Sequence, residues 1–200
     1  MKLSLFLTLP PTLQAELGLL RGSLDDVHWT PAERSLIPLQ HLGRITSRPE
    51  MEELDMALSR LHWEPFCLAL HQVGHQMGET EDRLTVGVTP QQPLVALQKR
   101  LASALRRAGF PPPRRPAVPE LTIGRLPPAS PTDLIPWIQR HNLFHSSSMT
   151  VDHVSLMEVI PAGNEKQYRL LETYPARPDL TIPDGMSFYD DDEEEEDGGA

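Results

Sequence analysis

The chain has 200 residues, of which 39% are hydrophobic, a single cysteine and a net charge of −10. A chain of this length buries a core without cross-links and a lone cysteine cannot form an internal disulfide, which excludes the small disulfide-stabilised proteins and favours the cytoplasm. No segment is apolar enough to span a bilayer, and without one run of eight acids at residues 190–197 the net charge would be −2.

The first nine residues carry one lysine and a short apolar run, a pattern that also begins secretory signals. Pro10 and Pro11 end this run at barely the length of a signal core, and Ala15 has no small residue two positions before it. We therefore expect a first strand rather than a secretory signal.

The first half of the chain alternates predicted strands and helices. In order, these are a strand at 2–9, a helix at 11–20, a turn at 29–33, a strand at 35–41, a helix at 47–62 and a strand at 65–73. Pro38 inside the second strand predicts an edge position or a β-bulge. Ser47 and Glu50 have the spacing of a helix capping box. Cys67 lies in an apolar run and is expected to be buried.

The second half repeats this order of elements. We predict a strand at 84–89, a helix at 93–108, a proline-rich turn at 111–119, a strand at 120–124, a helix capped by Asp133, and a hairpin of strands at 149–160 and 167–174. Leu36 and Glu120 occupy corresponding strands 84 residues apart. This correspondence indicates an internal duplication, with lobes at about 1–83 and 84–178 related by a pseudo-two-fold axis, and a ligand cleft between positions 36 and 120.

The segment at 179–200 has the composition of a disordered, solubilising acidic tail, because its run of like charges repels itself and buries nothing. A second interpretation is that the tail mimics nucleic acid or occupies a basic groove.

The alternation of side chains along two of the predicted strands indicates which residues face the cleft. With a period of two, Glu120 and Thr122 share one face of their strand, and Leu36 and Pro38 share one face of theirs.

Several short motifs lie along roughly residues 1–175. They are Leu9-Pro10, Trp29-Thr30-Pro31-Ala32-Glu33, Leu42-Gly43, Pro93-Leu94-Val95-Ala96-Leu97-Gln98, Ala108-Gly109-Phe110 and Tyr168. Together they resemble the motifs of the two-histidine (2H) phosphoesterases, in the branch of bacterial RNA 2′,3′-cyclic phosphodiesterases, or 2′-5′ RNA ligases.

This resemblance implies an α+β fold, a single two-lobed domain at 1–178 with mostly antiparallel sheets, helices packed outside and a central groove. It also implies a His-x-Thr-x motif in each half, where one histidine protonates the leaving oxygen, the other activates water and the threonines hold the phosphate. The first motif is replaced here by Leu36-Ile37-Pro38-Leu39, and the second, Glu120-Leu121-Thr122-Ile123, keeps only its threonine.

These replacements remove the usual acid and base, each of which contributes about 10²- to 10⁴-fold to the rate. Leucine cannot transfer a proton, and an ionised glutamate accepts a proton but repels a phosphodiester. His41 follows Leu36 by five residues, which turns it to the opposite strand face unless a bulge at Pro38 resets the register.

We expect no metal site among the remaining histidines, and we expect no cofactor. His71 and His75, like His141 and His145, have the spacing of a metal pair on a helix, but neither pair has a matched third ligand.

Basic residues are dense between 99 and 125. They form either the solvated face of a helix and turn, or a phosphate-steering rim of Arg114, Arg115 and Arg125 beside Thr122.

Three functions remain open at this point. The first is a catalytically impaired family member that binds a nucleotide or RNA-end phosphate. The second is an active phosphoesterase that uses Glu120 as base and Thr122 as phosphate contact. The third is a non-catalytic scaffold that binds a partner and is regulated through its acidic tail. In all three cases we expect a monomer.

Overall fold

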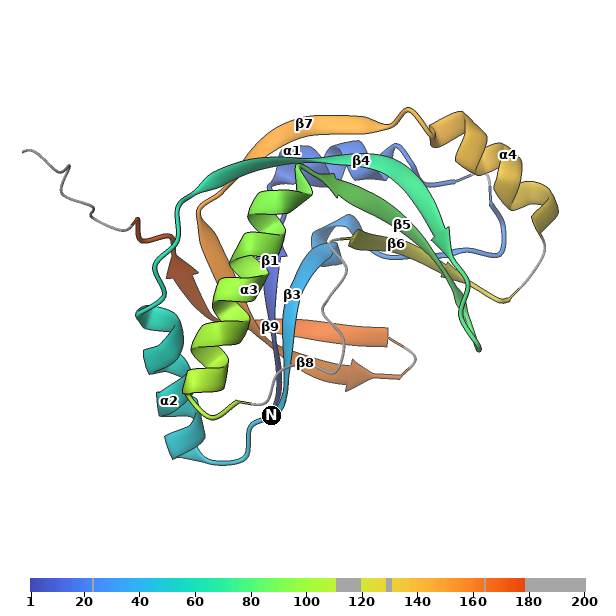
Figure 1. Cartoon of the computed structure of the whole chain (residues 1–200). Helices are drawn as coiled ribbons and strands as arrows, with labels where there is room; N and C mark the ends of the chain where they lie inside the picture. Colours follow the sequence, from blue (N-terminus) through green and yellow to red (C-terminus); the bar gives the residue numbers. More distant parts are fainter. Residues whose placement is uncertain (23, 111–119, 129–130, 164, 179–200) are drawn as a thin grey trace, which may run out of the picture.

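Two antiparallel sheets organise the chain (Figure 1). The structure, a computed structural model, describes residues 1–22, 24–110, 120–128, 131–163 and 165–178. The first sheet has the order β3-β1-β8-β9 and the second the order β2-β6-β5-β4-β7. The strands are β1 Lys2–Thr8, β2 His28–Trp29, β3 Leu36–Arg44, β4 Phe66–Gln76, β5 Asp82–Thr89, β6 Glu120–Leu126, β7 His145–Val151, β8 His153–Ala162 and β9 Glu165–Pro175.

Four α-helices and a short 3₁₀ helix connect these strands within the described residues. They are α1 Pro11–Gly18, the 3₁₀ helix η1 Ala32–Arg34, α2 Arg48–Ser59, α3 Gln91–Arg107 and α4 Pro131–His141. The predicted capping box is confirmed, because the Glu50 amide donates to the Ser47 side chain and the Glu50 carboxylate accepts from the Ser47 amide. None of the described helices has both the length and the apolar character needed to cross a bilayer.

One face of each sheet packs into a common core. The core takes Leu3, Leu5 and Leu7 from β1 and the apolar faces of α2 and α3, which cover the first sheet on that side. From the second sheet it takes residues such as Leu84 and Leu121. Phe6, on the opposite face of β1, belongs to a second and smaller apolar cluster. This opposite face is the one on which the candidate site lies.

The α+β architecture agrees with the sequence prediction, but both sheets mix the two halves of the sequence. The first sheet pairs β1 and β3 with β8 and β9, and the second pairs β4 with β5 and β7. The division into lobes at 83/84 and the internal duplication therefore stay predictions.

Some local predictions need correction. The strand predicted at 149–160 is two strands that meet at Asp152, where the chain passes from the second sheet to the first. Trp29, predicted in a turn, lies in β2. Helix α4 begins at Pro131 rather than at an Asp133 cap, since proline fits a first helical turn. Cys67 is exposed because it faces away from the core beside Thr150 of β7, with 3.8 Å between Sγ and Oγ1.

Candidate functional site

Glu120, Thr122 and Arg125 share one face of β6. Glu120 lies opposite Gly87 and Thr122 opposite Thr85, so alternation places both on one side, as predicted. The register then shifts at Ile123, where Gly124 pairs with Leu84, and this β-bulge returns Arg125 to the same side.

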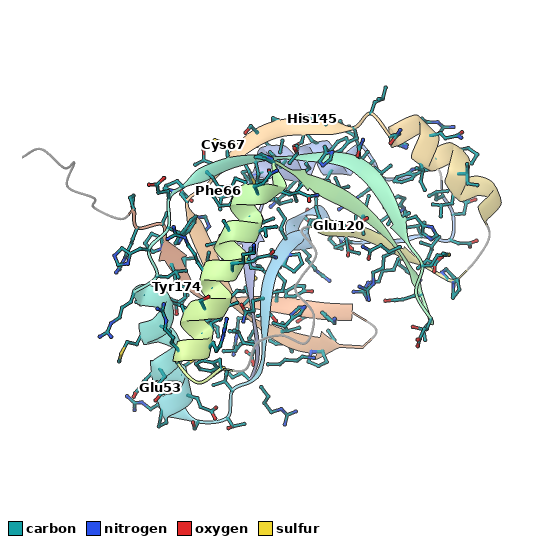
Figure 2. The ribbon with its side chains drawn as sticks, in the orientation of Figure 1. Glu53, Phe66, Cys67, Glu120, His145 and Tyr174 are labelled. Carbon is teal, nitrogen blue, oxygen red and sulfur yellow. The ribbon has the colours of Figure 1, made fainter. Side chains whose placement is uncertain are left out.

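A hydrogen bond across this face fixes the Glu120 carboxylate. Gln76 Nε2 of β4 donates to Glu120 Oε2 at 2.5 Å. Because β5 separates β4 from β6, the bond spans two strands, which requires the sheet to curl toward this face (Figure 1). The carboxylate is therefore held over the inner side of the curled sheet, and Figure 2 shows Glu120 at the start of β6.

The first motif lies on an apolar face instead. Leu36 is opposite Thr8 and Pro38 opposite Phe6. The smaller cluster packs Leu36 and Tyr168 against three buried side chains, Phe6, Met157 and Val159. The rings of Phe6 and Tyr168 meet edge to face at 5.2 Å. Position 36 is thus part of a packed cluster and offers no group that transfers a proton.

The structure brings the two motif strands together. β3 is the edge strand of its sheet and contacts β6 of the other sheet. Helix α3 supports β3 from behind, because Gln98 Nε2 donates to the carbonyl oxygens of Pro38 at 3.5 Å and Leu39 at 3.4 Å.

His41 lies on the same face of β3 as Leu36, and the expectation of the opposite face is wrong. A bulge at Leu39 shifts the register, as predicted for the neighbourhood of Pro38, and places His41 opposite Ser4. Its Nδ1 lies 2.9 Å from Ser4 Oγ. Partial burial, followed by the charges of Lys166 and Lys2, lowers the pKa of His41, which therefore favours the neutral imidazole.

Cations from both sheets gather near His41. The pKa of Lys166 on β9 is lowered first by burial and then by Arg125, Lys2 and Arg83, while Glu81 opposes these effects. Arg125 Nη1 lies 3.4 Å from Glu81 Oε1. This group, the cation cluster of Lys2, Arg83, Arg125 and Lys166, carries more positive than negative charge. A bound anion would relieve its internal repulsion.

The sequence analysis missed a hydrogen-bonded chain beside Leu36. Thr8 Oγ1 lies 3.2 Å from His153 Nε2, and His153 Nδ1 lies 2.6 Å from Asp152 Oδ1. Thr8 and His153 are far apart in sequence, so only the sheet register reveals their contact. His153 is two strands from Leu36, or roughly 10 Å, which is too far for its ring to take over the position of the motif histidine.

Other predicted residues do not join this face. Arg114 and Arg115 lie outside the described residues. His75 belongs to β4 rather than to a helix, and its Nε2 lies 2.8 Å from Asp82 Oδ2. His141 ends α4 while His145 begins β7, so that pair does not share a helix either. In the part of the chain that the structure describes, no three histidine, cysteine or acidic residues form a metal-ligand group.

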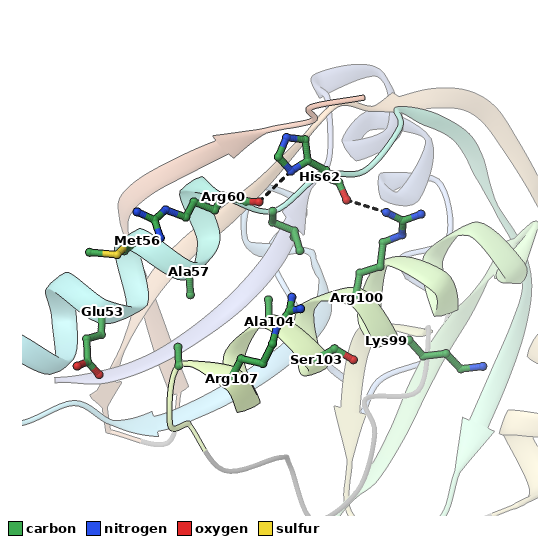
Figure 3. A pocket seen from close by; sticks show the side chains of 12 residues that line it. Glu53, Met56, Ala57, Arg60, His62, Lys99, Arg100, Ser103, Ala104 and Arg107 are labelled. Atoms are coloured by element: carbon green, nitrogen blue, oxygen red, sulfur yellow. Dashed lines mark hydrogen bonds between the residues drawn. The ribbon is translucent and has the colours of Figure 1, made fainter. Parts of the chain in front are cut away.

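A pocket of about 720 Å³ opens elsewhere, between α2 and α3 (Figure 3). None of its lining residues belongs to β3 or β6.

A model of the 2′-5′ RNA ligase superfamily matches residues 37–160, which is more than half of the chain. Among solved structures, TT0787 of Thermus thermophilus is 19% identical with a TM-score of 0.67, covering 89% of this chain and 99% of that one. LigT of E. coli, solved in complex with 3′-AMP, is 20% identical with a TM-score of 0.68, covering 88% and 97%. At these identities the likeness shows the fold. No curated protein matches the chain in sequence.

Proposed function

Because the chain belongs to the 2′-5′ RNA ligase superfamily, we propose that it binds a nucleotide or an RNA-end phosphate on the faces of β3 and β6 and turns it over poorly. The cation cluster is the observation that carries this proposal. It joins the curled face bearing Thr122 to the sheet bearing the first motif, and burial followed by the charges of its other members lowers the pKa of Lys166. A phosphate is the anion that arginine and lysine side chains bind best.

Ligands of fold relatives agree with this assignment. LigT of E. coli was solved in complexes with 3′-AMP, with phosphate and with ATP. In this chain, Thr122 and Arg125 would contact the phosphate, and the predicted rim residues Arg114 and Arg115 would steer it. We also propose that the protein is a monomer. We place it in the cytoplasm, since Cys67 is an exposed and unpaired thiol that a reducing compartment protects.

Poor turnover follows from the chemistry of the motif positions. The first motif contributes Leu36 and Pro38 to an apolar face, and the second contributes a carboxylate that repels the substrate. The paired acid and base of the family, which together would accelerate the reaction by several orders of magnitude, are replaced in sequence.

Calorimetric titration of 3′-AMP tests the binding proposal. Arg125→Ala and Lys166→Ala should each weaken binding by about 10- to 100-fold, because a hydrogen bond to a charged group contributes about 1.5–3 kcal/mol. Arg169→Ala is the matched control. Arg169 lies on β9 like Lys166, but its side chain points to the opposite face of the strand, where it pairs with Glu158. Absence of binding at millimolar 3′-AMP, or equal loss in all three variants, would overturn the proposal.

A second candidate function is slow hydrolysis of a cyclic phosphodiester with Glu120 as base and Thr122 as phosphate contact. The hydrogen bond from Gln76 favours it, because a carboxylate held in one orientation can serve as a positioned proton acceptor. Incubation with a 2′,3′-cyclic nucleotide should then give a monophosphate in the wild type and none in Glu120→Gln. A product that persists in Glu120→Gln would exclude this mechanism.

A further inference from the structure

The pocket between α2 and α3 presents cationic side chains from both of its walls (Figure 3). Its charged lining residues are Arg60, Lys99, Arg100, Arg107 and one acid, Glu53. Among the described residues, none forms an ion pair with Arg60, Lys99 or Arg107. Arg100 is held in place because its Nη1 donates to the carbonyl oxygen of His62 at 2.9 Å. The pocket is therefore a ready site for negative charge.

The backbone does not cancel this positive charge. Both helices end at the pocket, at Arg60 for α2 and at Arg107 for α3, and each helix C-terminus carries about −0.5 charge. Counting only Arg60, Lys99 and Arg107, and with Glu53 and the two helix ends included, the pocket keeps a net charge of about +1.

The described chain ends beside this pocket. The Trp63 amide donates to the Arg177 carbonyl oxygen at 2.8 Å, and the residue before Trp63, His62, lines the pocket. Residues 179–189 then separate Pro178 from the acidic run at 190–197. Fully extended, these eleven residues span about 40 Å. The pocket wall from Lys99 to Arg107 is only about 12 Å of helix, so the run reaches it easily.

We propose that the acidic run at residues 190–197 docks in this pocket of its own chain. The eight negative charges of the run meet the positive charges of Arg60, Lys99 and Arg107, and Phe188 and Tyr189 directly precede the run. Their rings match the apolar part of the lining, which includes Ala57, Leu61 and Ala104. Tethering raises the local concentration of the run to the millimolar range, so individually weak, exposed ion pairs suffice to hold it.

This inference goes beyond the proposed function, because the pocket is separate from the faces of β3 and β6. The acidic run would cover the α2–α3 surface and prevent other polyanions from binding there. Because exposed charges are screened within about 10 Å at 0.1 M salt, the contact should open as the ionic strength rises.

Nuclear magnetic resonance on the full chain tests the contact. The comparison variant carries Asn or Gln at all eight positions of the run, which keeps the length and removes the charge. At 50 mM salt, the backbone amide shifts of residues 56–62 and 99–108 should differ between the wild type and this neutral-tail variant, and at 1 M salt the difference should vanish. Identical spectra at low salt, or a difference that salt leaves unchanged, would overturn the proposal.

A peptide of residues 184–200 provides the second measurement. It should bind the neutral-tail variant more tightly than the wild type, because the wild-type run competes for the pocket. Adding Arg107→Glu to the neutral-tail variant should weaken peptide binding by roughly tenfold. Arg106→Glu is the matched control, since Arg106 lies in the same last turn of α3 but outside the pocket.

Three results of these two measurements would contradict the proposal. They are equal effects of Arg106→Glu and Arg107→Glu, equal peptide affinity for the wild type and the neutral-tail variant, and amide shifts of the wild type that depend on protein concentration. The last would indicate docking on a second copy of the chain.

Discussion

Position 36 is one of the few positions at which the proposed loss of the family mechanism can be tested by substitution. The backbone that would carry both motifs is present, with β3 against β6 and alternation that turns Glu120 and Thr122 to one side. The triple variant Leu36→His, Pro38→Thr, Glu120→His should therefore hydrolyse a 2′,3′-cyclic nucleotide at least about 10²-fold faster than the wild type. Initial rates measure this.

The double variant Leu36→His, Pro38→Thr is the control, because it restores one motif and leaves Glu120 in place. Folding of each variant is checked by circular dichroism, since Leu36 packs in the smaller apolar cluster. A folded triple variant with wild-type rates would mean that the two faces are not aligned for the reaction.

His41 should make stability depend on pH. Burial and the charges of Lys166 and Lys2 lower its pKa from the ordinary value of 6.5, so the unfolded chain binds more protons than the folded one. The free energy of unfolding should therefore fall as the pH drops below about 6.5, and His41→Gln should flatten this fall. Urea unfolding at pH 5, 6, 7 and 8 measures it. The exposed His62, changed to Gln, is the control, and equal slopes in both variants would contradict the prediction.

For single residues, the sequence predicts the strand face of a side chain only where regular alternation determines it. Glu120 and Thr122 follow directly from a period of two. His41 and Arg125 reach their faces through bulges at Leu39 and Ile123, and a bulge shifts every later residue to the other side. The Pro38 signal indicated the first bulge, whereas Ile123 carries no such signal. The contact of Thr8 with His153 depends on the order of strands, which alternation does not encode.

Among the elements, β2 and β6 approach each other closely at Gly124. A Cβ added there would lie 2.7 Å from Val27 Cγ1 and 3.3 Å from Trp29 Cε3. Gly124→Ala should therefore lower the free energy of unfolding by about 1–3 kcal/mol, because the well-packed neighbours must move. Gly18→Ala at the end of α1 should raise it by about 0.4–1 kcal/mol, since nothing lies within 4 Å of the added Cβ.

Thermal or urea unfolding of these two glycine variants gives the comparison. Both changes add one methyl group to a glycine. Changes of opposite sign in the free energy of unfolding would therefore isolate the effect of the close contact at Gly124. Destabilisation of similar size in both would show that the β2–β6 approach is not tight in solution.

Helices were easier to predict than strand ends. The helix predicted at 93–108 is confirmed as α3, which runs from Gln91 to Arg107. The boundary between β7 and β8 at Asp152 was missed, because Met149, Val151 and Val154 are all buried and the apolar pattern continues while the chain changes sheets. An apolar run reports burial and does not tell which sheet buries it.

For the whole molecule, the mixing of strands predicts that neither half folds alone. A fragment of residues 1–83 leaves β1 without β8 and β4 without both of its neighbours, and a fragment of residues 84–178 leaves β8 without β1. Each fragment should show little sheet signal in far-ultraviolet circular dichroism and no cooperative unfolding. The full chain is the control. Cooperative unfolding of either fragment would instead support two independent lobes.

The central place of β1 in its sheet also has a consequence for synthesis. β1 is made first, yet its partner β8 begins only at residue 153. At about 5–20 residues per second, the ribosome needs roughly 8–30 s to supply that partner. Throughout this interval one edge of an apolar strand lacks its partner. The nascent chain therefore presents a binding site for chaperones during this interval, and slow codons between β3 and β8 would lengthen the time in which it can aggregate.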